Sequence, residues 1–176
     1  MVIQLDSPLS AEQRVAIVDA LYRFGAGQDL KDRELFESAF APDAVLDFTQ
    51  PARDVGGRET SPMLGRNAIV GTVFGNLEDL DTTHTVANPR VIAYDGRHAA
   101  LWALVEAQHL PRDDHRRHLL LKNVYEVRLS QRQDLWRIEH LRIRNAWWDG
   151  DPTVLFPRRA SAVHAPANRI PEPSDA

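Results

Sequence analysis

The sequence contains no cysteine, which excludes disulfide bonds, thiolate metal ligands and a thiol nucleophile. It also has only two lysines, and its formal net charge at pH 7 is -4. Surfaces that bind nucleic acids or acidic membranes carry an excess of basic residues, so neither partner is expected. The chemistry of this chain must therefore come from its carboxylates, its hydroxyl groups and its seven histidines.

Hydrophobic runs long enough to cross a bilayer are also lacking, and residues 1–10 have neither the basic start nor the apolar stretch of a signal peptide. A cytoplasmic location is therefore expected. The glycine-rich motifs of nucleotide-binding loops and the G-x-S-x-G motif of serine hydrolases are missing as well. The chain has 176 residues, of which 43% are hydrophobic, and this is enough for one domain with a buried core.

The first part of the chain has the apolar spacing of helices. Ser10 begins a capping-box signal, and Gly25 and Gly27 predict the end of the helix that follows it. A second, shorter helix is expected between Asp32, as its N-cap, and Pro42, which stops it. The elements predicted for this part are helices over 10–27, 32–40 and 67–77, a strand over 44–49 and a polar loop over 50–62.

The second part of the chain has the alternation of strands, with Asp95 and Gly96 as a tight hairpin turn. Strands are predicted over 83–94, 98–110, 118–129 and 135–147. Helices followed by strands indicate an α+β fold in which the helices pack on one face of a curved antiparallel sheet. Residues 1–150 are expected to form the domain. The proline-rich segment 151–176 is expected to be an extended tail that can close over a pocket.

Two polar residues interrupt predicted strand faces that are otherwise apolar, because alternate residues of a strand share one face. His109 ends the row Leu101, Ala103, Val105, Ala107, and Asn123 interrupts the row Leu119, Leu121, Tyr125, Val127, Leu129. An unpartnered amide or imidazole in such a place costs about 1–3 kcal/mol, so each needs a partner. Each can be a hydrogen-bonded core residue or a residue that faces a ligand.

Three further residues are candidates from their positions alone. Asp29 follows the first helix, where it can cap the second helix, face solvent or serve a site. His84 begins the strand after the third helix, and it can be an ordinary strand-end histidine or a catalytic one. Asp47 lies within a predicted strand, where a structural and a catalytic role are both open.

The remaining histidines have weaker claims. His115 and His118 lie in the polar segment PRDDHRRH, where a metal site with Asp113 and Asp114 would lack a third ligand on a rigid element. A solvated hairpin tip is the better interpretation, and no metal site is expected.

A resemblance to a known family is carried by four segments: AIVDALYRFGAGQDLKDRELFESAFAPDAVLDF, HTVANPRVIAYDG, EAQHL and LWRIEHLRIRNAWWDGDP. Over most of residues 11–152 these resemble the SnoaL-like branch of the nuclear transport factor 2-like superfamily. The resemblance implies a cone-shaped α+β barrel, in which a curved antiparallel or mixed sheet and three helices enclose a pocket. It also implies a homo-oligomer, a dimer or a trimer.

Within this superfamily the patterns are most similar to scytalone dehydratases and hexachlorocyclohexane dehydrochlorinases, which catalyse eliminations without a cofactor. This similarity implies that Asp29, His84 and His109 are catalytic, with Asn123 in the pocket. Substrate contacts are expected from Asn123, Tyr22, Tyr125 and Phe48.

The sequence also departs from both enzyme patterns. Gln28 and Phe48 stand where the dehydratase has two tyrosines, and Leu121 stands where it has a serine. The first helix has no counterpart of the dehydrochlorinase lysine. Neither scytalone nor hexachlorocyclohexane is therefore the expected substrate.

The function that we expect is a lyase without cofactor that acts on a small hydrophobic or aromatic molecule. His84 would be the base, and Asp29 would orient it. His109 and Asn123 would polarise the carbonyl or help the leaving group depart. A polyketide-cyclase-type isomerase would use the same pocket, with the acid and the base acting on different carbons. A ligand- or protein-binding module without catalysis is the third alternative. No Asp-Arg-Asp set typical of epoxide hydrolases of this fold can be placed.

Overall fold

The computed structural model describes residues 4–5 and 8–156. Its helices are α1 (Ala11–Asp29), α2 (Arg33–Ser38), α3 (Thr49–Asp54), α4 (Arg66–Asn76) and the 3-10 helix η1 (Pro152–Val154). Its strands are β1 (Gln4–Leu5), β2 (Phe40–Asp47), β3 (Met63–Leu64), β4 (Leu80–Tyr94), β5 (His98–Pro111), β6 (Leu119–Arg132) and β7 (Leu135–Gly150). Helices mostly precede the four long strands, which is the order that the sequence predicts.

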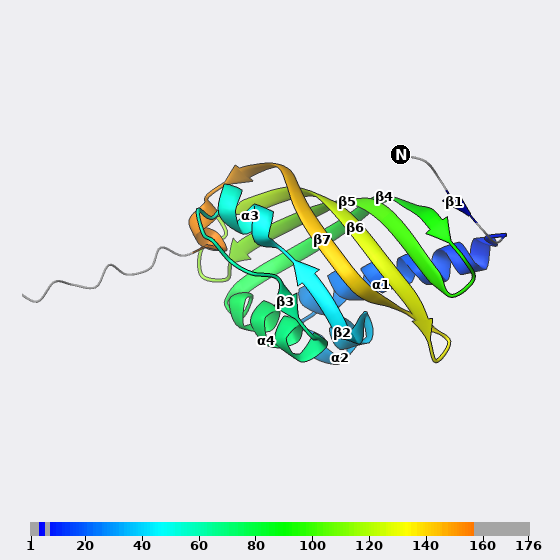
Figure 1. Cartoon of the computed structure of the whole chain (residues 1–176). Coiled ribbons are helices and arrows are strands. Elements are labelled where there is room, and N and C mark those ends of the chain that lie inside the picture. The colour runs from blue at the N-terminus through cyan, green and yellow to red at the C-terminus, as the bar shows by residue number, and fades with distance from the viewer. Residues whose placement is uncertain (1–3, 6–7, 157–176) are drawn as a thin grey trace, which may run out of the picture.

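One curved sheet contains the seven described strands in the order β1-β4-β5-β6-β7-β2-β3. Strands β4 to β7 form an antiparallel meander, whereas β1 pairs with β4 and β2 pairs with β7 in parallel. Helix α1 crosses one face of this sheet, and α2 and α4 lie on the same side (Figure 1). The buried core lies between the helices and the sheet and includes Leu21, Phe24, Phe40 and Tyr125. The predicted α+β cone fold is therefore confirmed.

Helix α1 begins where the sequence predicts and ends later. Ser10 is its N-cap and takes part in the expected capping box. The helix continues through Gly25 and Gly27 to Asp29, so the prediction that these glycines end it is wrong. The absence of a side chain at Gly27 serves packing instead, because a Cβ there would lie 2.6 Å from the backbone nitrogen of Phe36 in α2. This close approach holds the last turn of α1, with Asp29, against the rest of the molecule.

The segment after α2 becomes a strand earlier than predicted. Helix α2 ends at Ser38, and β2 begins at Phe40 because Phe40 already pairs with Ile138 of β7. A register shift lies between Phe40 and Val45, so the strand passes Pro42 through an irregular stretch. This irregularity explains why the sequence pattern shows only the second half of the strand.

The predicted polar loop over 50–62 contains a helix, α3, that the sequence analysis missed. Asp47 stands just before it, and its Oδ1 accepts hydrogen bonds from the Thr49 amide at 3.0 Å and the Thr49 hydroxyl at 2.7 Å. Ala52 of α3 is buried against the protein. Tertiary packing stabilises this turn, and the polar composition of the segment does not reveal it. These contacts support the structural alternative for Asp47.

The long strands of the meander confirm the predicted alternation. The row of odd-numbered residues that ends at His109 is buried, as is the row that contains Asn123 and Tyr125. Strands β5, β6 and β7 end later than predicted, and β4 begins earlier, at Leu80. The earlier start of β4 brings Thr82 into the sheet, two residues before His84, which the sequence predicts to be a site residue.

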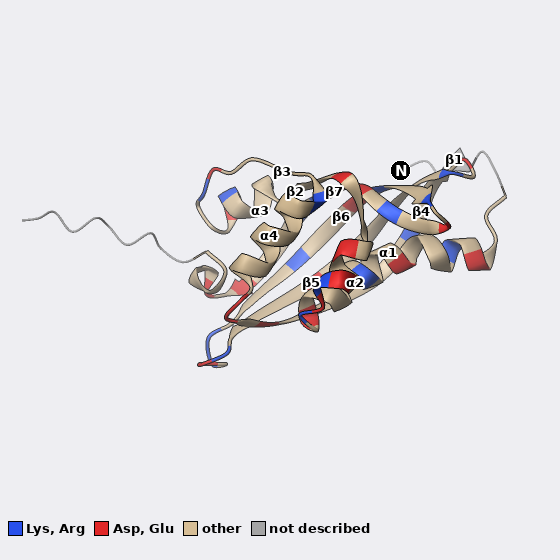
Figure 2. Cartoon of the chain, turned by 90° about the horizontal axis from the view of Figure 1, so that it is seen from below, with Lys and Arg blue, Asp and Glu red and all other residues tan. Residues whose placement is uncertain are grey.

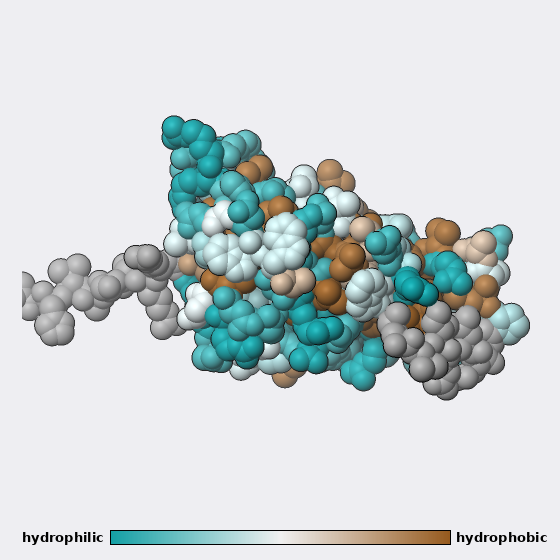
Figure 3. Space-filling model, turned by 90° about the horizontal axis from the view of Figure 1, so that it is seen from above, coloured by the Kyte–Doolittle hydropathy of each residue, from teal (hydrophilic) through white to brown (hydrophobic). Residues whose placement is uncertain are grey.

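The outer face of the sheet carries exposed apolar side chains. Leu104 is exposed, and the Lys122 ammonium lies 5.4 Å from the centre of the exposed Trp147 ring. Figure 3 shows hydrophobic side chains scattered among hydrophilic ones on one side of the molecule. The homo-oligomer that the family resemblance implies stays a prediction.

Acidic and basic residues are mixed along α1 and α2 (Figure 2). This mixture agrees with the small net charge of the chain. Among the described residues, no helix combines the length and the hydropathy needed to span a bilayer.

The predicted tail is described only at its beginning. Residues 151–156 contain η1, and Phe156 stacks on Phe48 with ring centres 6.1 Å apart. Four of the prolines on which the tail prediction rests, Pro157, Pro166, Pro171 and Pro173, lie outside the described residues.

Two glycine substitutions test the packing at the end of α1. Alanine normally stabilises a helix relative to glycine by about 0.5–1 kcal/mol. Gly27→Ala is instead expected to lower the free energy of unfolding by about 1–3 kcal/mol, because its Cβ would collide with α2. Gly71→Ala in α4 is the matched control, since no atom lies within 4 Å of its Cβ position, and it should stabilise the protein. Urea unfolding of both variants measures the difference, and equal stabilisation by both would contradict the packing role.

Candidate active site

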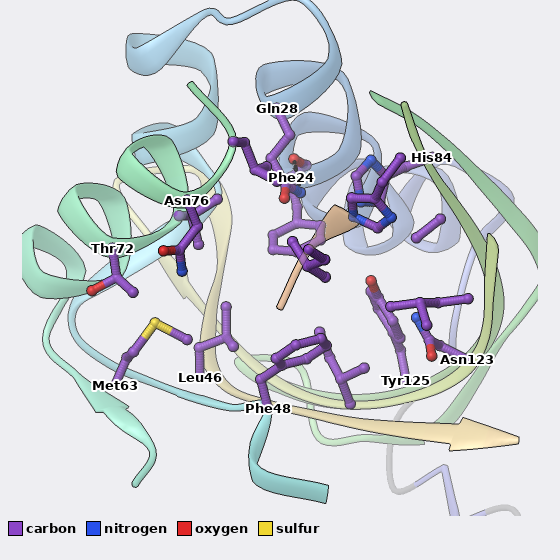
Figure 4. A pocket seen from close by; sticks show the side chains of 17 residues that line it. Phe24, Gln28, Leu46, Phe48, Met63, Thr72, Asn76, His84, Asn123 and Tyr125 are labelled. Carbon is purple, nitrogen blue, oxygen red and sulfur yellow. Dashed lines mark hydrogen bonds between the residues drawn. The ribbon is translucent and has the colours of Figure 1, made fainter. Parts of the chain in front are cut away.

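A cavity opens between the sheet and helices α1 and α4, and its empty space, together with the solvent at its mouth, is about 560 Å³. Its polar lining residues are Gln28, Thr72, Asn76, His84, His109, Asn123 and Tyr125. Its apolar lining residues are Phe24, Leu46, Phe48, Met63, Val73, Leu77, Ala107, Leu121, Ile143 and Leu155. His84, Asn123 and Tyr125 face the cavity from one side, and Thr72, Asn76 and Met63 face it from the other (Figure 4).

The centre of the site is a contact between the last residue of α1 and strand β4. Asp29 Oδ1 lies 2.7 Å from His84 Nδ1, and Asp29 Oδ2 accepts a hydrogen bond from the His84 backbone amide at 2.7 Å. The hydroxyl of Thr82 donates to Asp29 Oδ1 at 2.9 Å. These contacts hold the carboxylate from three directions. They also direct Nδ1–H of His84 to the carboxylate, which leaves Nε2 as the ring nitrogen available to a ligand.

Burial and charge act in opposite directions on Asp29. Burial raises the pKa of its carboxyl, but the hydrogen bonds from His84 and Thr82 and the charge of His84 outweigh this effect and lower the pKa below its usual value. Asp29 is therefore ionised at neutral pH. The His84 side chain is only 5% exposed, and a Cβ added at Gly25 would lie 3.1 Å from the His84 Cβ. The helix thus packs directly against the histidine that its last residue binds.

The second histidine lies next to the first because of strand register. Thr82 is paired with His109 and His84 with Ala107, so the two histidines are diagonal neighbours on β4 and β5. Their ring centres are 6.1 Å apart at an angle of 82°. The small side chain of Ala107 leaves room for this arrangement.

His109 is neutral at physiological pH. Burial, followed by the charge of His84, lowers the pKa of His109 to about 4. Its Nδ1 lies 3.3 Å from the carbonyl oxygen of Leu119, the residue paired with it on β6. Since this carbonyl can only accept, the proton of the neutral ring is on Nδ1. In this tautomer His109 Nε2 is an acceptor. The expected role of His109, to polarise a carbonyl or to help a leaving group depart, stays a prediction.

Asn123 and Tyr125 supply hydrogen-bond donors instead. Asn123 is 2% exposed, and its Oδ1 accepts a hydrogen bond from Asn145 Nδ2 at 3.0 Å. Its amide nitrogen lies on the side of Tyr125 (Figure 4). Burial, and then the charge of Asp29, raise the pKa of Tyr125 well above its ordinary value, so its hydroxyl stays protonated.

The structure brings together all but one of the predicted site residues. His84, His109, Asn123, Tyr125 and Phe48 line the cavity, and Asp29 lies behind His84 rather than in the cavity wall. The prediction for Tyr22 is wrong. Tyr22 is 47% exposed and does not line the cavity, because successive helical residues point about 100° apart and its neighbour Leu21 takes the buried position.

His115 and His118, which the sequence places at a hairpin tip, form surface contacts. His115 Nε2 lies 2.9 Å from Asp81 Oδ2, and His118 Nε2 lies 3.3 Å from Asp149 Oδ2. Both pairs are exposed, and both tie the hairpin between β5 and β6 to its surroundings.

Sequence reasoning missed several residues of the site. Thr82 binds Asp29, and Thr72 and Asn76 line the cavity from successive turns of α4. Gln28, which the sequence analysis placed at the position of a dehydratase tyrosine, lines the cavity, is buried and donates from Nε2 to the Phe24 carbonyl at 3.0 Å. The alternation of β4 puts Thr82 on the same face as His84, and this signal could have identified it. Nothing in the spacing of α4 indicates which of its faces meets a cavity.

The chain belongs to the SnoaL-like domain family, whose model matches residues 9–142. A curated relative, the terrestric acid biosynthesis cluster protein E of Penicillium crustosum, is 31% identical over 151 residues, which is 81% of this chain and 88% of that protein. The family membership that the sequence segments indicate is thereby confirmed.

Solved structures support the fold. A Novosphingobium aromaticivorans protein provisionally described as an aromatic ring hydroxylase matches with a TM-score of 0.71 and 19% identity, over 82% of this chain and 96% of that one. A protein of the same organism provisionally described as a scytalone dehydratase matches with a TM-score of 0.66 and 17% identity, over 77% of this chain and 85% of that one. The hexachlorocyclohexane dehydrochlorinase of Novosphingobium barchaimii matches with a TM-score of 0.63 and 17% identity, over 84% of this chain and 96% of that one. The two enzyme types to which the sequence patterns are similar are thus among the structural neighbours.

The low pKa of His109 makes stability depend on pH. In the unfolded chain this histidine has a pKa of about 6.5, so between pH 6.5 and pH 4 the unfolded state binds more protons than the folded state. The free energy of unfolding should therefore fall as the pH falls through this range, by about 3 kcal/mol from His109 alone. His109→Asn can keep a bond to the Leu119 carbonyl but cannot titrate. Urea unfolding at several pH values should show a smaller loss in this variant, and an equal loss would contradict the assignment.

Proposed function

We propose that this protein removes a proton from a carbon next to a carbonyl group and thereby catalyses an elimination or an isomerisation. The observation that carries the proposal is the hydrogen bond between Asp29 Oδ1 and Nδ1 of His84, with His84 in the wall of a mostly apolar cavity. A carboxylate that accepts from one ring nitrogen fixes the tautomer and makes the other nitrogen a better base.

The first step is a proton transfer from the carbon to His84 Nε2. The electron pair of the broken C–H bond moves toward the carbonyl and leaves negative charge on its oxygen. The Tyr125 hydroxyl and the Asn123 amide nitrogen are the donors on the same side of the cavity, and they would stabilise this charge (Figure 4). Asp29 is the positioning residue, since it touches His84 and not the cavity.

The second step decides between the two reaction types. In an elimination, the enolate expels a hydroxyl group from the neighbouring carbon, and His84 returns its proton to this group, so that water leaves and a double bond forms. In an isomerisation, His84 returns the proton to a different carbon. Neutral His109 has its proton on Nδ1 and offers Nε2 as an acceptor for a substrate hydroxyl. One base is enough for both reactions.

The substrate class follows from the cavity and from the relatives. The apolar lining, with Phe24, Phe48 and Leu121 in it, suits an aromatic or other hydrophobic ketone. The curated relative is named as a protein of the terrestric acid biosynthesis cluster. A role in small-molecule biosynthesis is therefore the context that we propose for this enzyme.

Substitution of Asp29 or His84 tests the proposal. Asp29→Asn and His84→Ala are expected to slow proton exchange at the α-carbon of aryl ketones by about 10²–10⁴, because the base is lost or its tautomer is no longer fixed. Proton NMR in deuterium oxide measures this exchange, and the release of water from β-hydroxy ketones is measured in parallel.

A second His–Asp pair provides the matched control. His98 Nδ1 lies 3.1 Å from Asp95 Oδ2 at the exposed hairpin, far from the cavity lining. His98→Ala should leave exchange unchanged. If His84→Ala keeps its fold and the full exchange rate, the protein is not a His84-dependent enzyme, and the non-catalytic binding module becomes the better interpretation.

Tyr125→Phe tests the stabilisation of the enolate. The change removes one hydroxyl from a fully buried ring and keeps its packing against Phe24. We expect kcat to fall by about 10²–10³ while KM changes little, because the donor acts on charge that forms in the transition state. Steady-state kinetics separate the two parameters. A change in KM alone would show that Tyr125 only binds the substrate.

A further inference from the structure

A second chamber lies against the candidate active site. It lies between α3, the segment after α3, α4 and η1, is open at one edge, and holds about 1180 Å³ of empty space when the solvent at that edge is included. Five residues line both spaces: Phe48, Met63, Thr72, Asn76 and Leu155. These residues form a neck. Met63, Thr72 and Asn76 lie across the inner cavity from His84, so the neck leads away from the proposed base (Figure 4).

The outer chamber is a built part of the fold. Its wall includes Phe156, which stacks on Phe48 with an angle of 15° between the rings. A Cβ added at Gly56 would lie 2.5 Å from the Phe156 ring, so only glycine allows this close packing. The backbone amide of Arg58 donates to the Ala52 carbonyl at 2.9 Å and holds Arg58 in the wall.

The charges of this chamber favour an anion. Arg58 is half-buried, and none of the ion pairs among the described residues includes it. Thr60 and Ser61 add two hydroxyl groups to the same wall. Asp79 also lines the chamber but is exposed, so water screens its charge more than that of Arg58.

We propose that the outer chamber binds the carboxylate end of an elongated substrate whose ketone end lies in the inner cavity. A carboxylate matches the planar guanidinium with two parallel hydrogen bonds. A phosphate carries a second negative charge, which Asp79 would repel and for which the lining offers no cation besides Arg58. The inference rests on the proposed function for the placement of the ketone, and it adds the substrate class: a keto acid with an apolar chain between its two functional groups.

Binding measurements test the chamber without any need for turnover. The probes are phenyl ketones that carry a linear chain ending in a carboxylate, in its methyl ester or in an amine, with chains of increasing length. Calorimetry gives the Kd, and the NMR signal of the His109 ring shows that the ketone end occupies the inner cavity. We expect the acid to bind more tightly than the ester and the amine once the chain is long enough to pass the neck.

Three variants assign the effect to Arg58. Arg58→Gln should weaken binding of the long-chain acid about tenfold and leave the ester unchanged. Asp79→Asn should strengthen binding of the acid about twofold, because it removes a like charge. Arg53→Gln is the matched control, since Arg53 precedes Arg58 in the same region but pairs with Asp54 at 2.7 Å and does not line the chamber.

The possible failures are distinct. Equal affinities of acid and ester for the wild-type protein, tighter binding of the amine, or equal losses in Arg58→Gln and Arg53→Gln would each overturn the anion site. Failure of every probe to bind would overturn it as well. If the acid binds as expected but His84→Ala retains full proton exchange, the proposed function fails and the carboxylate site stands.

Discussion

The contact between Asp29 and His84 is the constraint on which the rest of the site depends. It joins the end of α1 to the beginning of β4, two segments that are 55 residues apart in sequence. Both oxygens of the Asp29 carboxylate accept hydrogen bonds. Oδ1 binds the His84 ring and the Thr82 hydroxyl, and Oδ2 binds the backbone amide of His84 in β4. A half-buried carboxylate needs such partners to remain charged. The same contacts that keep Asp29 ionised therefore fix the direction in which His84 presents its free nitrogen.

Small residues make this contact possible. Gly27 lets α2 approach the end of α1, and Gly25 lets α1 approach His84. Ala107, opposite His84 on β5, leaves space beside both histidine rings. A larger side chain at Gly27 would collide with α2, and one at Gly25 would press on His84. Ala107 lines the cavity itself, so a larger side chain there would reduce its space.

The two sides of the cavity differ in what they can do. His84, His109, Asn123 and Tyr125 bring the proposed base and three further polar side chains to one side. The rest of the lining is mostly apolar, apart from polar groups near the neck. A ligand with one polar end therefore has one favourable orientation in the inner cavity, with its reacting group toward the histidines. Orientation of this kind is what proton transfer requires, because the rate depends on the distance between base and carbon.

The sequence by itself determined which faces of the strands are buried, so alternation alone identified His109, Asn123 and Tyr125 as inward-facing. It also determined the start of α1, because capping is a local property of a few consecutive residues. The pairing of Asp29 with His84 was expected only from the family resemblance, and only the tertiary structure decided that Thr82 joins them, that α3 forms, and that Tyr22 faces solvent. Periodicity reports which side of an element is buried, whereas contacts between distant segments depend on strand register and on the volumes of the side chains between them.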